Sequence, residues 1–287
     1  MIDRQRIVLE LVRRAPRPPS RTHLMKWLFL LREETVVGGT SSAFYDFLPY
    51  RYGPFSFVAY RELGALAAAG LLAPDELRIP SVARRDAAAE TAKLDEPVRE
   101  AVDEILSRFG SLSRAKLVDV VYERYPWFAS RSELRERQET RIAEVAVYTV
   151  GYEGRSVDAL LNALLRDGIR RVVDVRKNAF SRKYGFTAAT FGRLCRDVDI
   201  EYVHLPELGV PSALRADLTT AAAYEKLFDY YERTILPAQR KSVRRAADLT
   251  RELPSALMCF EANACSCHRG RLAPRVAELA ELPIQHL

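Results

Sequence analysis

Long hydrophobic runs are missing from this sequence. Its 287 residues contain no apolar run that approaches the roughly 18 residues needed to cross a bilayer. The first residues, Met1 to Arg6, open an amphipathic helix and not a signal peptide. Cysteine is scarce too, and three of the four cysteines, Cys259, Cys265 and Cys267, crowd into one loop instead of spreading across the fold as disulfides would. We therefore expect a cytoplasmic protein with reduced thiols and no membrane partner.

Blocks of like charge and basic tails are also missing. Lys and Arg number 44 against 38 Asp and Glu, and the net charge of +6 allows a polyanionic partner without requiring one. An apolar content of 48% is ordinary for a globular chain, and the length suffices for two domains with separate cores. Function must therefore be sought in local motifs.

The amino-terminal segment, residues 1–85, is predicted to be mainly helical. Apolar spacing predicts helices at 2–15, 21–34 and 56–69, an aromatic extended stretch at 44–52, and a small hairpin or wing at 71–82. Helix, helix, strand, helix, wing is the order of a winged-helix module, in which one helix enters a DNA groove. We predict such a DNA-binding module here, and a helical protein-interaction or dimerisation module is the alternative.

The stretch from Phe44 to Phe57 contains Tyr52-Gly-Pro54 and is followed by Tyr60-Arg-Glu-Leu63. It resembles the Tyr-Gly-Pro signature of small helical modules related to the Panacea antitoxin-type domain and its winged-helix relatives. The function of these relatives varies. The predicted phosphate contacts are Arg51, Arg61 and Arg78, which are solvated surface charges in the alternative interpretation.

Residues 86–144 are predicted to be a helical extension and linker. Amphipathic helices are expected at 97–109 and 113–125, and the polar, charged residues 128–144 are typical of an interdomain linker.

From residue 145 to residue 287 strands alternate with helices. This order predicts an α/β domain with a mostly parallel sheet and helices on both faces. Strands are expected at 145–150, 171–175, 200–204 and 256–260, and helices at 156–167, 187–197 and 272–282, with two more between 221 and 251.

The ends of these strands carry polar residues. Open α/β sheets bind ligands at the carboxyl ends of their strands, so side chains that follow the strands are expected to meet there. They are Tyr152, Glu153 and Arg155 after the first strand, Asp174 and Arg176 at the second, His204 at the third, and Cys259, Glu261, Cys267, His268 and Arg269 around the fourth. Four strands that deliver polar groups to one edge predict a functional crevice.

Segments at these same places share a family pattern. They are Tyr148 to Ser156, Val173 to Arg176, Phe180 to Lys183, Tyr202 to Gly209, and Cys259-Phe-Glu261 with Cys267-His-Arg269. Together they resemble the domain of unknown function 488 family over residues 146–282. The resemblance implies an α/β fold and says little about activity. Cys265 departs from the pattern and adds a second thiol beside Cys267.

A metal site is the first chemical interpretation of this loop. It would use Cys259, Cys267 and His268, with His204 or Glu261 as a further ligand, because thiolates and imidazole suit zinc or iron. The spacing lacks the second paired knuckle of structural zinc sites. The sequence therefore predicts no stoichiometric metal, although a divalent ion stays open as a cofactor.

A nucleophilic thiolate is the second interpretation. His268, Arg269 and a following helix N-terminus would lower the pKa of Cys267. Cys265 and Arg271 even have the spacing of phosphatase and rhodanese loops. However, Cys265 lies five residues past the strand instead of directly after it, so chance explains that match better.

Acid–base catalysis is the third interpretation. Asp174 and Glu261 would act on a water while Arg176, Arg182 and Arg269 hold a phosphate. The structural alternative is that Asp174–Arg176 and Glu261–Arg269 are ion pairs that pin the crevice.

The leading hypothesis from these patterns is a DNA-binding enzyme that hydrolyses a bond at a base, sugar or phosphate. It would be a glycosylase or nuclease in DNA repair, modified-base removal or defence against phage, and its ligand would be a nucleotide or modified base. The alternative is a non-enzymatic DNA-binding regulator that senses a small anionic ligand or metal. The patterns specify no oligomeric state. The catalytic candidates are Asp174, Glu261, Cys267 and His268, and the ligand-binding candidates are Tyr152, Glu153, Arg155, Arg176, Arg182, His204 and Arg269.

Overall fold

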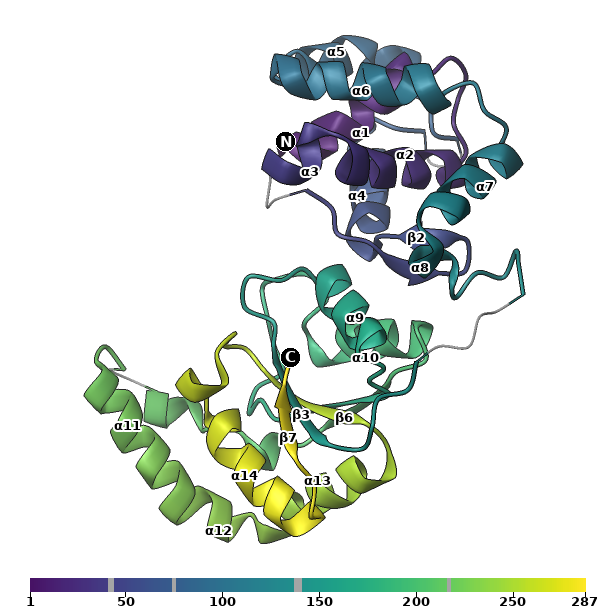
Figure 1. Cartoon of the computed structure of the whole chain (residues 1–287). Coiled ribbons are helices and arrows are strands. Elements are labelled where there is room, and N and C mark those ends of the chain that lie inside the picture. Colours follow the sequence, from purple (N-terminus) through teal and green to yellow (C-terminus); the bar gives the residue numbers. More distant parts are fainter. Residues whose placement is uncertain (41–43, 74–75, 137–140, 216–217) are drawn as a thin grey trace. The chain divides into compact units, whose positions relative to one another are not determined.

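The computed structural model describes residues 1–40, 44–73, 76–136, 141–215 and 218–287. The chain divides into two compact units, Met1–Glu139 and Thr140–Leu287 (Figure 1). Each unit has a hydrophobic core of its own. Within the described ranges, no helix is both long enough and apolar enough to span a bilayer.

Helices dominate the first unit. Its elements are α1 (Asp3–Arg14), α2 (Arg21–Glu34), α3 (Val36–Thr40), β1 (Leu48–Tyr50), β2 (Gly53–Phe55), α4 (Phe57–Ala68), α5 (Arg84–Thr91), α6 (Glu96–Phe109), α7 (Arg114–Arg124) and α8 (Pro126–Ala129). The central element is α2, in which Leu24 to Leu31 are all buried. A helix that is apolar on every side must be covered on every side, and α1, α3, α6 and α7 pack around it.

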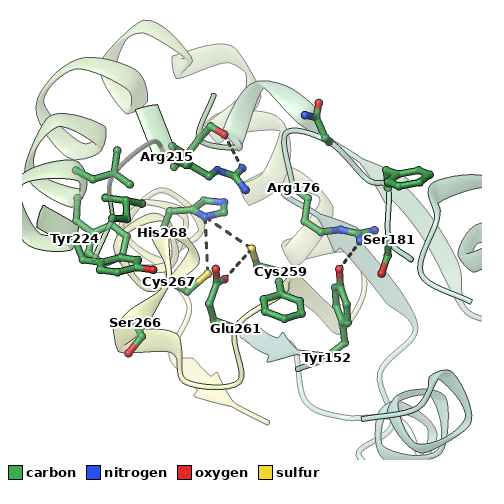
Figure 2. A pocket seen from close by; sticks show the side chains of 17 residues that line it. Tyr152, Arg176, Ser181, Arg215, Tyr224, Cys259, Glu261, Ser266, Cys267 and His268 are labelled. Atoms are coloured by element: carbon green, nitrogen blue, oxygen red, sulfur yellow. Dashed lines mark hydrogen bonds between the residues drawn. The ribbon is translucent and has the colours of Figure 1, made fainter. Parts of the chain in front are cut away.

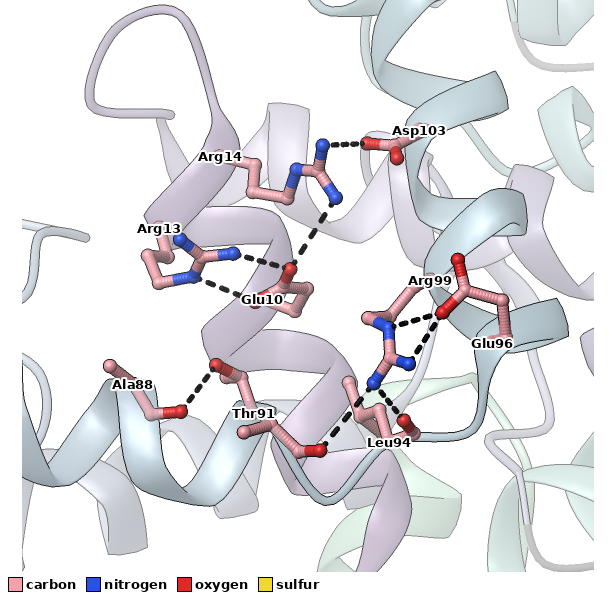
Figure 3. Close-up of polar contacts among 10 residues, drawn as sticks. Glu10, Arg13, Arg14, Ala88, Thr91, Leu94, Glu96, Arg99 and Asp103 are labelled. Atoms are coloured by element: carbon pink, nitrogen blue, oxygen red, sulfur yellow. Dashed lines mark hydrogen bonds and ion pairs between the residues drawn. The ribbon is translucent and has the colours of Figure 1, made fainter.

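The predicted helical extension packs into this same core. Val102 and Ile105 of α6 and Val121 of α7 are fully buried in one cluster with Leu28 of α2. Polar contacts reinforce the packing, because Arg14 of α1 lies 2.7 Å from Asp103 of α6 (Figure 3). Residues 137–140 of the predicted linker lie outside the described residues.

The aromatic stretch forms a hairpin where one extended segment was predicted. Strands β1 and β2 pair in antiparallel fashion around a turn at Arg51 and Tyr52, and Gly53, which begins β2, has φ of 89°, a backbone conformation that favours glycine. The predicted wing is not confirmed, because its described residues, 71–73 and 76–82, contain no strand. Its central Pro74 and Asp75 lie outside the described residues.

A parallel sheet forms the centre of the second unit, so the predicted α/β class is confirmed. Its strands are β3 (Val147–Gly151), β4 (Arg171–Asp174), β5 (Glu201–His204), β6 (Ser255–Cys259) and β7 (Ile284–His286). They lie in the order β5-β4-β6-β3-β7, and every pairing is parallel. Helices α9 (Val157–Arg166) and α10 (Ala188–Asp197) lie on one face, and α13 (Arg240–Glu252) and α14 (His268–Ala280) lie on the other (Figure 1). Helices α11 (Ala221–Tyr230) and α12 (Leu236–Ala238) precede α13.

Two features of this unit differ from the predicted pattern. Strand β7 is exposed and polar at the edge of the sheet, so it has no apolar signature. Helix α14 begins at His268, four residues before the predicted start. The prediction relied on apolar spacing, and the first turn of this helix is polar although His268 and Arg269 in it are buried. The early start places His268 and Arg269 in that first turn.

The central strand β6 lies between β3 and β4, so the carboxyl ends of these three strands meet at one edge. Gly151 ends β3 there. A Cβ atom on Gly151 would lie 1.8 Å from the carbonyl oxygen of Glu261, so only glycine lets the loop after β6 cross so close to β3.

Candidate functional site

A pocket of about 330 Å³ opens at the carboxyl edge of the sheet (Figure 2). Four residues from the end of β6, the loop after it and the start of α14 carry its reactive groups: Cys259, Glu261, Cys267 and His268. Tyr152 and Arg176 line it from the loops after β3 and β4. The structure therefore brings together six of the predicted site residues.

The two thiols and the imidazole form one cluster. Nδ1 of His268 lies 3.8 Å from Sγ of Cys259 and 3.8 Å from Sγ of Cys267 (Figure 2). On the other side of the ring, Nε2 lies 3.1 Å from the carbonyl oxygen of Val175. A carbonyl can only accept a hydrogen bond, so Nε2 carries a proton and Nδ1 is the ring nitrogen that faces both sulfurs.

The loop that carries this cluster is held by its backbone. The guanidinium of Arg269, which is buried, donates hydrogen bonds to the carbonyls of Glu261 and Ala262. Glu153 accepts a hydrogen bond from the amide of Ala262 at 2.9 Å, and its own amide donates to Phe260. Arg269 and Glu153, which were predicted as ligand contacts, therefore brace the loop.

Glu261 lies beside the thiols, with Oε2 at 3.4 Å from Sγ of Cys259. Burial, together with the neighbouring Cys267 sulfur, raises the pKa of the Glu261 carboxyl. A hydrogen bond from the Cys259 thiol and the adjacent imidazole lower the pKa of Cys267, while the same hydrogen bond and burial raise the pKa of Cys259. The pKa of Cys267 is thus lowered, and the pKa values of its two acidic neighbours, Cys259 and Glu261, are raised.

Asp174 has a different environment. It is fully buried, and its oxygens accept hydrogen bonds from the backbone amide, Nε and Nη2 of Arg176 and from the hydroxyl of Tyr202, at 2.6 to 3.1 Å. Nη1 of Arg176 donates to the hydroxyl of Tyr152 at 2.9 Å. The contacts of Nε, Nη1 and Nη2 orient the guanidinium, and the Tyr202 hydroxyl holds the carboxylate, so Asp174 serves as the ion-pair partner that positions Arg176 at the pocket.

The other predicted residues lie outside the described lining of the pocket. Arg155 is half-buried and Arg182 is exposed. Nε2 of His204 contacts the carbonyl oxygen of Arg176 at 2.8 Å and so supports that backbone.

The pocket has an aromatic rim, because Phe180, Phe260 and Tyr224 in its lining are 74%, 45% and 39% exposed. Arg215 adds a cation, and its Nη2 donates to the carbonyl of Val210 at 2.6 Å. The sequence interpretation missed Phe260, Tyr224 and Arg215. Phe260 falls in a segment of the family pattern and could have been found there. Arg215 and Tyr224 come from the segment between β5 and α13, where no motif marks them.

Comparison with known proteins gives one family. The model described as Domain of unknown function DUF488 matches residues 156–276, which confirms the predicted resemblance over that segment. The match contains the Cys259, Cys267 and His268 cluster together with Glu261. No curated protein and no solved structure shows significant similarity to the chain.

The structural role of Asp174 predicts the effect of its removal. Asp174→Asn leaves the buried Arg176 guanidinium without its counter-charge, which should lower the free energy of unfolding of the α/β unit by about 3 to 5 kcal/mol in urea denaturation. Glu201→Gln is the control, because Glu201 is a half-exposed partner of Arg171 and should cost at most about 1 kcal/mol. An Asp174→Asn protein that unfolds at the same urea concentration as its parent would contradict this role.

Proposed function

We propose that this chain is a DNA-binding hydrolase and that the pocket of its DUF488 segment attacks a base, sugar or phosphate of one nucleotide. The observation that carries the proposal is the position of Glu261. Its carboxylate lies next to the cluster of Cys259, Cys267 and His268, and the pocket that contains it has an aromatic rim.

The pocket suits a nucleotide in size and chemistry. A volume of about 330 Å³ is at the lower end of the range for small-molecule sites and admits one nucleotide unit. Exposed rings such as Phe180 and Phe260 can stack on a base, which contributes about 1 to 3 kcal/mol per base. Arg215, which is exposed, lines the same pocket and offers its guanidinium group to phosphate oxygens.

Glu261 is the group that can move protons in this pocket. Its carboxylate removes a proton from a water, and the water oxygen forms a bond to the electrophilic carbon or phosphorus of the substrate. The bond to the leaving group breaks, and the leaving atom takes the proton back from Glu261. The net reaction consumes one water and needs no redox partner.

The first unit carries a surface that suits nucleic acid. Tyr50, Phe55 and Tyr60 form a row of rings whose neighbouring centroids lie 5.0 and 5.6 Å apart. Arg51 lies over Tyr50 at one end of the row, and Arg21 lies over Tyr60 at the other, at 5.6 and 5.3 Å from the ring centroids. A row of partly exposed rings with a guanidinium group at each end combines the features that bind bases and phosphates.

Catalysis by Glu261 predicts a loss of turnover without a loss of folding. Glu261→Gln keeps the shape of the side chain and removes its base, so product formation should fall by about 10²-fold or more. The assay measures products from labelled DNA with normal and modified bases and from a panel of nucleotides. The thermal midpoint should shift by a few degrees at most.

Glu207→Gln is the matched control, because Glu207 is exposed near the same sheet edge and does not line the pocket. Full activity per folded molecule of Glu261→Gln would show that Glu261 is structural. Absence of turnover by the parent protein on every substrate, with DNA binding intact, would favour the regulator instead.

DNA binding by the first unit predicts a change in salt dependence. Arg51→Ala with Arg61→Ala should weaken DNA binding and lower the slope of log K against log salt by about 0.9 for each phosphate that the variant no longer neutralises. Arg78 is left unchanged because its ion pair with Glu76, at 2.5 Å, is closer than that of Arg51 with Glu133, at 3.5 Å. The measurement is a binding titration at several salt concentrations.

The control for this experiment removes the same charge elsewhere in the unit. Arg84→Ala with Arg85→Ala alters two exposed residues of α5, which lies at the other end of this unit from β2 (Figure 1). Equal affinities of the parent and the Arg51, Arg61 variant at low salt would reject this surface as the DNA-binding face.

A further inference from the structure

The cluster of Cys259, Cys267 and His268 has the geometry of a metal site. Its two Sγ atoms and Nδ1 all lie within 4.8 Å of one another, and all three residues are buried. Among the described residues, these three side chains lie close enough together to hold one metal ion. Cys259 ends β6, and Cys267, eight positions later, directly precedes α14. The loop between them brings the two sulfurs together.

The distances fit a tetrahedral zinc ion. With a Zn–S bond of about 2.3 Å and a Zn–N bond of about 2.0 Å, the sulfur and nitrogen ligands of such an ion lie about 3.5 Å apart. Both sulfurs of the cluster lie 3.8 Å from Nδ1 of His268. Movements of a few tenths of an ångström would therefore bring each sulfur to the distance from Nδ1 that such an ion requires, and the two sulfurs lie within 4.8 Å of each other.

The imidazole is already oriented as metal-binding histidines are. Such rings donate the proton of the second nitrogen to a carbonyl or carboxylate, which fixes the tautomer and directs the other nitrogen at the metal. Nε2 of His268 makes this contact with the carbonyl of Val175 at 3.1 Å. Tyr231 packs against the ring edge to face, with centroids 5.4 Å apart, and limits its rotation.

Arg176 and Arg269, two buried cations at this sheet edge, are committed to other partners. The guanidinium of Arg176 donates to Asp174, Tyr152 and the carbonyl of Phe186, and that of Arg269 donates to two backbone carbonyls. Neither guanidinium group donates a hydrogen bond to the two sulfurs or to the carboxylate of Glu261. A set of two soft sulfur ligands and one imidazole favours zinc.

We propose that Cys259, Cys267 and His268 bind one zinc ion whose fourth coordination position faces the pocket and holds a water beside Glu261. Three protein ligands are the set of catalytic zinc sites, whereas structural sites use four. All three ligands and Glu261 line the pocket, so a ligand in the pocket can reach the open position. Metal binding is independent of the proposed function, whereas the role of the bound water as the attacking water rests on it.

The test begins with metal-free full-length protein. The chain is stripped with a chelator, titrated with zinc or cobalt(II), and passed through a desalting column before metal analysis. We expect about one zinc per chain to be retained. The cobalt form should show thiolate-to-cobalt absorption in the near ultraviolet and the intense visible bands of a tetrahedral site.

Variants then assign the ligands. Cys259→Ser, Cys267→Ser and His268→Gln should each lower zinc affinity at least about 100-fold, since each removes a direct ligand. Cys265→Ser should keep the zinc, because this exposed thiol lies in the same loop but outside the cluster. Glu261→Gln should also keep it, because the fourth position belongs to water. Circular dichroism checks that each variant is folded, and the cobalt spectrum of the parent gives an answer that needs no variant.

Three results would overturn the inference. They are a cobalt spectrum without thiolate absorption, loss of zinc in Cys265→Ser with retention in Cys267→Ser, and loss of zinc in Glu261→Gln, which would make Glu261 the fourth ligand. The two proposals fail separately. Zinc retention without turnover on any substrate would reject the hydrolase and leave the metal site, and full turnover by protein shown to contain no metal would do the reverse.

Discussion

The hydrogen bond between His268 and the carbonyl of Val175 is the interaction on which the rest of the site depends. It joins the first turn of α14 to the end of β4 and fixes which ring nitrogen is free to face the thiols. For the ring to reach that carbonyl, the loop after β6 must fold back across the sheet edge. Gly151 makes room for that loop, and Arg269 and Glu153 hold its backbone in place.

At the carboxyl edge of the sheet, one strand ends in a carboxylate with a structural role and its neighbour ends in reactive groups. At the end of β4, Asp174 has its hydrogen-bonding capacity filled by Arg176 and Tyr202, so it positions a cation. At the end of β6, the side chains of Glu261 and Cys259 line the pocket. Both carboxylates follow buried strands, and the difference between them comes from their neighbours in space.

Much of this arrangement could be predicted from the sequence, because parallel strands place their carboxyl ends together whatever the details of packing. The sequence left the role of Asp174 open between acid–base catalysis and an ion pair with Arg176, since the choice depends on the register that pairs Tyr202 of β5 with Val172 and lets its hydroxyl reach Asp174. The spacing of the cysteines along the chain also argued against zinc. Spacing shows only which residues are close in sequence, whereas Nδ1 of His268 comes close to Sγ of Cys259 because the loop after β6 folds back. Strand β7 was missed because its exposed residues carry no apolar pattern, so its pairing with β3 alone defines it.

X-ray absorption at the zinc edge of the reconstituted protein tests the central claim most directly, because it reports the ligand atoms themselves. The account predicts two sulfur ligands at about 2.3 Å with one nitrogen and one oxygen at about 2.0 to 2.1 Å. A coordination shell of oxygen and nitrogen alone would contradict it, because it would place the zinc away from Cys259 and Cys267.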